Sequence, residues 1–399
     1  MIQYNWPVPY PIRACSRARS CALGFVAWAV LAAAPAHSQN SCARPGEWTV
    51  PGVGRAAAPD VLARAARDSV VLIGESHDNE DHHRWQLQTI AALAALHPKA
   101  VLGFEMFPRR VQGALDRWVA GEITEKEFLA ATDWTRVWTY EAALYLPLFH
   151  FARLNHIPMV ALNVDNEFVR TVNSRGLKAV PPEKREGVSD PAPASAAYID
   201  RLFTVYSAHP DKDPGATRGD PGFRRFVDAQ LVWDRAMAQA LAEASTRNPG
   251  ALVVGVMGSS HISYGYGVPH QLRSLGIERI ASLLPWDPSE RCEGFSPDLA
   301  TAVFGMPARR LAARPLLGIR VEPVPDGVKV SEVSPGSIAE AAGLRAGDVL
   351  VEVAGSVVKE TEDVRAMVRA MAPGTWLPLK AKRAGGFVEL TAKFPPAKK

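Results

Sequence analysis

The chain has no surplus of basic residues of the kind that binds nucleic acid. Its formal net charge is only +4 over 399 residues, and Arg13, Arg17 and Arg19 near the N-terminus supply three of those charges. The remainder is close to neutral, which argues against DNA or RNA as a partner. With 47% hydrophobic and 22% charged residues the composition is globular, and the length favours two domains.

The chain also lacks a convincing transmembrane segment. The apolar run Cys21–Ala34 follows the basic stretch and is too short for a comfortable membrane-spanning helix. Small residues at Ala34-Pro35-Ala36 and at Ala36-His37-Ser38 offer cleavage sites. The pattern predicts a secretion signal over residues 1–38, with an uncleaved anchor as the alternative. We therefore expect an exported protein that is periplasmic or associated with the outer membrane.

Cysteine is scarce, with four in the whole chain. Cys15 and Cys21 would leave with the signal, so Cys42 and Cys292 would be the thiols of the exported protein. In an oxidising compartment, two cysteines that bracket one domain predict a disulfide. Lipidation of Cys42 is the alternative, but Gln39-Asn40-Ser41 lacks the aliphatic residue expected three positions before a lipidated cysteine.

Residues 60–290 alternate strand-like apolar runs with helical patterns. Such alternation favours parallel strands joined by right-handed crossovers. We therefore predict an α/β domain over residues 42–292, with a doubly wound, largely parallel sheet and flanking helices, in which Ile280–Leu284 is the last strand. The helix candidates are Asp81–Leu96, Arg109–Ala120, Glu125–Thr132, Glu141–Leu154, Glu167–Asn173 and Phe223–Arg247.

One stretch interrupts this alternation. Residues 174–221 contain Pro181-Pro182 and several further prolines, which favours a long insertion or lid with one short helix over Ala196–Ser207. A disordered excursion is the alternative. A change of composition then marks residues 293–313 as a linker to a second, β-rich region.

Four apolar runs end in polar residues suited to catalysis or ligation. Because the carboxyl ends of parallel strands meet at one edge of a sheet, carboxylates and imidazoles from separate segments can form one site there. The polar residues are Glu75 and His77 after Val70–Ile73, Glu105 after Val101–Phe104, Asn163 after Met159–Leu162, and His261 after Leu252–Met257.

Two interpretations of this set compete. Glu and His side chains ligate Zn²⁺, Mn²⁺ or Fe²⁺ and can activate water, whereas the plainer alternative makes each residue a hydrogen-bonding anchor at a strand end. On the first interpretation the metal ligands are Glu75, His77, His82 and His261. The catalytic residues of the corresponding hydrolase are Glu75, His77, Glu105 and His261.

Aromatic residues gather in the same region. Some follow a loose helical spacing, which is typical of a packed core. A flat apolar slot with a Tyr or His donor is also what haem requires. The residues are Trp134, Trp138, Tyr140, Tyr145, Phe149, Tyr264 and Tyr266.

Five ordered motifs give this region a family resemblance. Over about residues 55–285 the chain resembles the ChaN-like haem-binding uptake proteins, whose superfamily also holds Tiki-type metalloproteases and erythromycin esterases. The motifs are Gly74-Glu75-Ser76-His77-Asp78 with His82-His83, Phe104-Glu105-Met106-Phe107 with Gln112, Trp138 through Tyr145-Leu146-Pro147, Ala161-Leu162-Asn163, and Gly258-Ser259-Ser260-His261.

The resemblance implies an exported or surface protein, often associated with iron acquisition, that binds haem between protomers through a tyrosine. A homodimer and proximity to a membrane are therefore open expectations. In the hydrolase branches the same Glu and His positions carry out chemistry. The implied iron ligand is Tyr145, with Tyr140, Tyr264 and Tyr266 left open, and the implied haem-binding set is Tyr145, Trp138, His83 and Tyr264.

Residues 314–395 resemble a PDZ domain, in which a peptide adds as a strand and backbone N–H groups capture its C-terminal carboxylate. The resemblance assigns those donors to Leu317, Gly318 and Ile319, and the side-chain pocket to Val364 and Val368. A purely structural module is the alternative. The supporting features are the loop strand Leu316–Ile319, the helix after Ser334-Pro335, the Ala346-Gly347-Asp348 turn, the groove helix Glu360–Met371 and the last strand Phe387–Ala392.

The sequence therefore predicts an exported protein that binds haem or iron, with a role in haem uptake and a PDZ module for peptide C-termini. The alternative is a metal-dependent hydrolase, either a peptidase or an esterase, whose PDZ presents C-terminal tails. A scaffold with a degenerate site is the third candidate.

Overall fold

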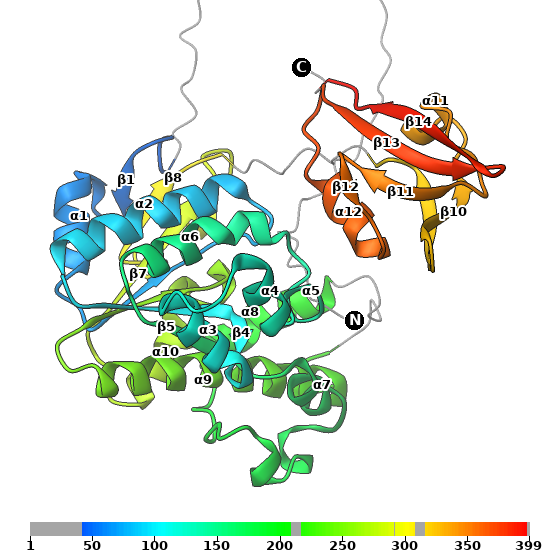
Figure 1. The fold of residues 1–399 in the computed structure, drawn as a ribbon. Helices are drawn as coiled ribbons and strands as arrows, with labels where there is room; N and C mark the ends of the chain where they lie inside the picture. The colour runs from blue at the N-terminus through cyan, green and yellow to red at the C-terminus, as the bar shows by residue number, and fades with distance from the viewer. Residues whose placement is uncertain (1–41, 209–216, 291, 308–315, 397–399) are drawn as a thin grey trace, which may run out of the picture. The chain divides into compact units, whose positions relative to one another are not determined.

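The computed structural model describes residues 42–208, 217–290, 292–307 and 316–396, and the chain divides after Arg310 into two compact units (Figure 1). The predicted secretion signal over residues 1–38 lies outside the described residues. Within them, no helix is long and apolar enough to cross a membrane.

The first unit is built on a sheet that has eight strands among the described residues, in the order β2-β1-β8-β7-β3-β6-β4-β5. Neighbours from β8 to β5 pair in parallel, and β1 and β2 form an antiparallel edge. The central strands are apolar throughout because both of their faces are covered. The strands are β1 Trp48–Val50, β2 Gly54–Ala56, β3 Val70–Ile73, β4 Ala100–Pro108, β5 Met159–Asn163, β6 Leu252–Val256, β7 Ile280–Trp286 and β8 Ala302–Gly305.

Helices cover both faces of this sheet, which confirms the predicted doubly wound α/β class (Figure 1). One face carries α1 Ala58–Ala65, α2 Glu80–Leu96 and α6 Ala142–Leu154. The opposite face carries α7 Asn166–Arg175, α9 Pro221–Arg247 and α10 Val268–Ser274. The connections between these layers contain α3 Gln112–Val119, α4 Glu125–Ala131, α5 Trp134–Val137 and α8 Ala196–Ser207.

The sheet extends beyond the stretch expected from the sequence. β8 lies within residues 293–313, which the sequence marks as a linker, and it pairs in parallel with β7. β1 then pairs with β8, so the start of the described chain closes the same edge. Strands of three or four residues carry too little alternation to be recognised from sequence alone.

The described part of residues 174–221 packs onto the first unit. α8 has the bounds predicted for it, and its first turn is capped by the Ser195 side chain, which accepts from the Tyr198 backbone N–H. Val180 and Val188 are buried in a cluster with residues of α7 and α9. Leu202 is buried with Phe223 and Phe226 of α9. This segment therefore contributes to the core beside α9.

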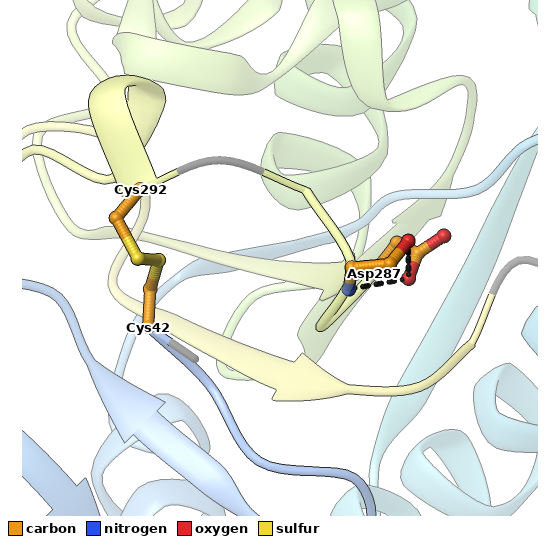
Figure 2. Close-up of a disulfide and its surroundings, with 4 residues drawn as sticks. Cys42, Asp287 and Cys292 are labelled. Atoms are coloured by element: carbon orange, nitrogen blue, oxygen red, sulfur yellow. Dashed lines mark hydrogen bonds between the residues drawn. A yellow bond between two sulfur atoms is a disulfide. The ribbon is translucent and has the colours of Figure 1, made fainter. Parts of the chain in front are cut away.

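Cys42 and Cys292 form the predicted disulfide (Figure 2). Their Cα atoms are 5.6 Å apart and their sequence separation is 250 residues. The bond ties the chain ahead of β1 to the segment after β7, at the edge where the antiparallel strands lie. A crosslink that closes so long a loop removes much conformational freedom from the unfolded chain.

The second unit is an antiparallel sheet in the order β14-β13-β11-β10-β9, with β12 paired to β11. Two helices, α11 Ile338–Ala341 and α12 Thr361–Arg369, pack with it around a small apolar core. This architecture is consistent with the predicted PDZ domain. The strands are β9 Ile319–Val324, β10 Gly327–Val333, β11 Val349–Val353, β12 Ser356–Val357, β13 Trp376–Arg383 and β14 Gly386–Lys393.

Candidate functional site

The sheet brings three polar segments to one edge. β3, β6 and β4 are adjacent and parallel, with Ile73 and Phe104 both in register with Val256. Glu75 and His77 follow β3, His261 follows β6, and Glu105 lies in the last part of β4. The structure therefore brings together Glu75, His77, Glu105 and His261.

His77 is held by a buried carboxylate two residues earlier in the chain. Its Nδ1 lies 2.7 Å from Oε1 of Glu75, which also accepts a 2.7 Å hydrogen bond from the Tyr145 hydroxyl. Oε2 of Glu75 accepts from Gln86 at 2.8 Å. Burial opposes ionisation of Glu75, but the charge of His83 and the hydrogen bonds from His77 and Tyr145 lower its pKa to about 2. Glu75 is thus a buried anion that orients His77.

His261 is held by a second buried carboxylate, supplied by α9. Its Nδ1 lies 2.6 Å from Oδ1 of Asp234, whose Oδ2 accepts a 2.7 Å hydrogen bond from the Tyr198 hydroxyl. Burial disfavours the imidazolium, yet Glu105 and Asp234 raise the pKa of His261 to about 10. His261 is therefore charged at neutral pH.

Glu105 lies between the two imidazoles. Its Oε1 is 3.5 Å from Nε2 of His261, and its Oε2 accepts a 2.7 Å hydrogen bond from the Gly258 backbone N–H. A Cβ on Gly258 would come within 3.2 Å of Nε2 of His77, so glycine permits this close approach. Burial raises the pKa of Glu105, but His261, His77 and Gly258 together bring it below its ordinary value.

His77 also carries an altered proton affinity. Burial lowers its pKa, but the hydrogen bond to Glu75 and the charge of Glu105 outweigh burial, and the pKa rises. The two histidines therefore flank Glu105 in closely similar fashion. Each has a carboxylate at Nδ1, and each follows a Gly-x-x-His pattern, residues 74–77 and 258–261.

His82 and His83 lie behind this group rather than beside it. Nδ1 of His82 accepts the Ser76 backbone N–H at 2.9 Å, and burial lowers its pKa to about 4, so the ring is neutral. Nε2 of His83 contacts the His77 carbonyl at 3.1 Å. Neither residue lines the cavity described below. Among the described residues, no group of three or more His, Cys, Asp or Glu side chains could hold a metal ion.

A cavity opens above Glu105, and the space between its walls, counted out to the mouth, is about 1130 Å³. His77, Glu105 and His261 form its floor. The walls are mostly apolar and aromatic, and they come from the segment after α5 and from α7 and α9. The wall residues include Trp138, Tyr140, Val164, Val169, Phe226, Ala229 and Trp233.

The tyrosines named from the sequence divide clearly. Tyr145 has no exposed surface, and its hydroxyl donates to Glu75. Tyr264 donates to the Gly294 carbonyl at 2.8 Å and does not line the cavity, and neither does Tyr266. Tyr140 does line it, with its ring centroid 5.1 Å from that of His77. The tyrosine that faces the cavity is therefore Tyr140.

Sequence reasoning missed the contribution of α9. Asp234 has no exposed surface, and Gln230, one turn earlier, contacts Nδ1 of His261 at 3.1 Å. Trp233 packs edge-on against the same imidazole at 5.5 Å. A carboxylate and an amide four residues apart on the apolar face of a long helix were the available signal.

The second unit presents the edge of a sheet beside a helix. β9 is the last strand of its sheet, and the carbonyls of Leu317 and Gly318 accept from Ala339 and Ser334. Gly318 has φ +80°, and a Cβ there would lie 2.3 Å from the Ser337 Cβ, so this loop requires glycine. On α12, Val364 is buried in the core and Val368 is half-buried.

Comparison with known proteins agrees with both units. A family model described as "Haem-binding uptake, Tiki superfamily, ChaN" matches residues 61–272, and a PDZ domain model matches residues 329–377. A curated relative, a probable periplasmic serine endoprotease DegP-like protein of Halomonas elongata, is 33% identical over 102 residues. That match covers 25% of this chain, and the chain spans only 20% of the relative.

A solved structure described as cofacial heme binding to ChaN of Campylobacter jejuni shares the fold of the first unit. It has a TM-score of 0.51 and 17% identity, and the match covers 64% of this chain and 95% of that one. Since the family model covers more than half of the sequence, the chain belongs to the ChaN family of haem-binding uptake proteins in the Tiki superfamily, and it carries a PDZ domain after that region.

Proposed function

We propose that the first unit binds haem in the cavity above Glu105 and that the PDZ domain binds peptide C-termini, in an exported protein that acts in haem uptake. The observation that carries the proposal is the aromatic-walled cavity with Tyr140 in its wall, in a chain of a haem-binding family. The N-terminal signal pattern supports export. The disulfide supports an oxidising compartment.

The residues of the cavity fit the chemical character of haem. Trp138 and Phe226 offer flat apolar surface for the macrocycle, and Tyr140 offers a phenol oxygen for the iron. The buried indole Nε1 of Trp233 has no hydrogen-bond partner among the described residues, so its wall is not fully satisfied by the protein alone. When bound, haem supplies an iron centre that takes an axial ligand from the protein.

Tyr140 is the axial ligand in this proposal, and His77 is the polar group beside it. Tyr145, the first choice from sequence, instead holds Glu75, and Glu75 holds His77. The floor therefore presents an imidazole that is fixed in orientation and carries a proton, because Glu75 and Glu105 favour its charged form.

A hemin titration tests the haem proposal. The unsubstituted protein is expected to shift the Soret band at micromolar hemin, and Tyr140→Phe to weaken binding on the order of tenfold or more. Tyr264→Phe is the matched control, since its hydroxyl contacts Gly294 outside the cavity. Absence of a shift, or equal loss in both variants, would contradict the proposal.

The peptide-binding proposal rests on the loop before β9. Among the described residues, the amides of Leu317 and Gly318 donate to no acceptor, while their carbonyls are engaged. A peptide that adds beside β9 would place its terminal carboxylate at these donors and its last side chain near Val368. Fluorescence anisotropy with a C-terminal peptide library should find binders that lose affinity when the carboxyl group is amidated. A library without binders would leave the module a structural role.

The arrangement of His77, Glu105 and His261 supports a second candidate, hydrolysis. Glu105 could accept a proton from water while an adjacent imidazolium donates to the leaving group. Activity on ester or peptide substrates that falls about 10²-fold or more in Glu105→Gln would favour it. Metal analysis of hemin-free protein decides the metal-dependent form, which predicts stoichiometric Zn or Mn that is lost in His77→Ala and His261→Ala.

A further inference from the structure

The mouth of the cavity differs in charge from its floor. On the floor every ionised group faces an opposite one, because Glu105 lies against His261 and each imidazole has its own carboxylate. The middle of the cavity is apolar. At the mouth, Arg170 is the one Lys or Arg among the described residues that line the cavity.

Arg170 belongs to a helix face that is turned to the cavity as a whole. Asn166, Val169, Arg170 and Asn173 all line it, at the spacing of one helical stripe. Phe168 and Val172 on the opposite side of α7 are buried against α9. The core therefore fixes which side of α7 faces the cavity.

The guanidinium of Arg170 has no hydrogen bond or ion pair with any described residue, whereas nearby charges are paired. Asp165, at the start of the helix, is held by Arg110 at 2.7 Å. Glu167, three residues before Arg170, forms no ion pair with it in the described chain. Arg170 is exposed, so the positive charge is available to a bound molecule.

We propose that Arg170, flanked by the side-chain amides of Asn166 and Asn173, forms a subsite for a carboxylate of the bound ligand. A guanidinium binds a carboxylate through two parallel hydrogen bonds, and amides one turn away on either side can donate to the same group. The cavity thus selects an amphipathic anion, whose apolar body lies between Trp138 and Phe226 and whose acid group reaches α7. This inference rests on the proposed haem function, in which the acid is a propionate.

The experiment compares three probes that separate the acid from the iron. Hemin has both, protoporphyrin IX lacks the iron, and hemin dimethyl ester has its acids blocked. Each is titrated by absorbance or fluorescence into the unsubstituted protein, Arg170→Gln and Arg175→Gln. Arg175 is the matched control because it is exposed on the same helix but does not line the cavity.

Arg170→Gln is expected to weaken hemin and protoporphyrin IX about tenfold and to leave the dimethyl ester unchanged. Arg175→Gln should change none of the three. Equal hemin affinity in Arg170→Gln and the unsubstituted protein, or an equal loss for the ester, overturns the subsite and leaves the haem proposal standing. Failure of the unsubstituted protein to bind any porphyrin overturns both.

Discussion

His77 and His261 occupy the same Gly-x-x-His pattern at the ends of adjacent strands, yet their surroundings differ. The His77 side chain is 18% exposed and lies against Trp138 and Tyr140, while that of His261 is 3% exposed and lies against Trp233. The carboxylate of His77 is two residues away, and that of His261 comes from α9. One pattern thus yields a histidine that meets a ligand and another that ties a helix to the sheet.

The difference teaches how a local motif acquires its role. Each imidazole is oriented at Nδ1 and directs its other nitrogen toward Glu105. Exposure decides which one can touch a bound molecule. The tests below remove one member of this arrangement at a time, and the expected effects decrease from the first to the last.

Removal of Asp234 should cause the largest loss. Asp234→Ala leaves the buried imidazolium of His261 without its closest counter-charge, so the free energy of unfolding should fall by about 3–5 kcal/mol. Urea denaturation measures the change. Asp228→Ala, on the same helix at a half-buried position, serves as the control. A loss below about 1 kcal/mol would show that the ion pair does not hold α9 to the sheet.

The raised pKa of His261 predicts a pH dependence of stability. Since the folded value of about 10 exceeds the ordinary 6.5, the contribution is complete below pH 6.5 and is lost as the pH rises toward 10. The loss should reach roughly 3 kcal/mol, because most of the shift is expressed in this window. His261→Gln should flatten the profile between pH 7 and 10. An unchanged slope in that variant would contradict the assignment.

The two supporting tyrosines give a smaller and more equal effect. Tyr198→Phe removes the donor to Asp234, and Tyr145→Phe removes the donor to Glu75, each at a cost of about 1–2 kcal/mol in thermal or urea unfolding. Tyr145→Phe should leave hemin affinity within about threefold, since the residue is fully buried. A tenfold loss of hemin affinity would restore Tyr145 as the iron ligand.

The smallest effect separates the histidines by ligand binding. His77→Gln should weaken hemin by about threefold to tenfold, roughly 1 kcal/mol, because it removes a polar contact at the floor. His261→Gln should change hemin affinity less, even though it destabilises the fold more. The reverse order would mean that the exposed imidazole is not the one beside the ligand.

The sequence predicted what is local and missed what is long-range. Glu75 and His77 could be placed because a buried strand, a turn and both residues follow one another in the chain. Asp234 could not, since its contact with His261 depends on how α9 lies across β6 and β4. Tyr140 and Tyr145 lie five residues apart in one aromatic stretch. Only the packing of α6 shows that Tyr145 is buried and that Tyr140 faces the cavity.

The PDZ domain was easier to foresee because its signals are dense. The loop before β9, the Ser334-Pro335 turn and the Ala346-Gly347-Asp348 turn all lie within about forty residues, so each element follows from its own local residues. The antiparallel edge of the larger sheet gave no such signal. β1, β2 and β8 are only three or four residues long, and their pairing joins the two ends of the unit.

The most direct test of the account is the absorption spectrum of hemin-loaded protein compared with that of Tyr140→Phe and Tyr145→Phe. We expect one saturable Soret shift in the unsubstituted protein, a tyrosinate-type spectrum that is lost in Tyr140→Phe, and its retention in Tyr145→Phe. A spectrum that survives in Tyr140→Phe, or the absence of saturable binding in the unsubstituted protein, would contradict haem binding in the cavity above Glu105.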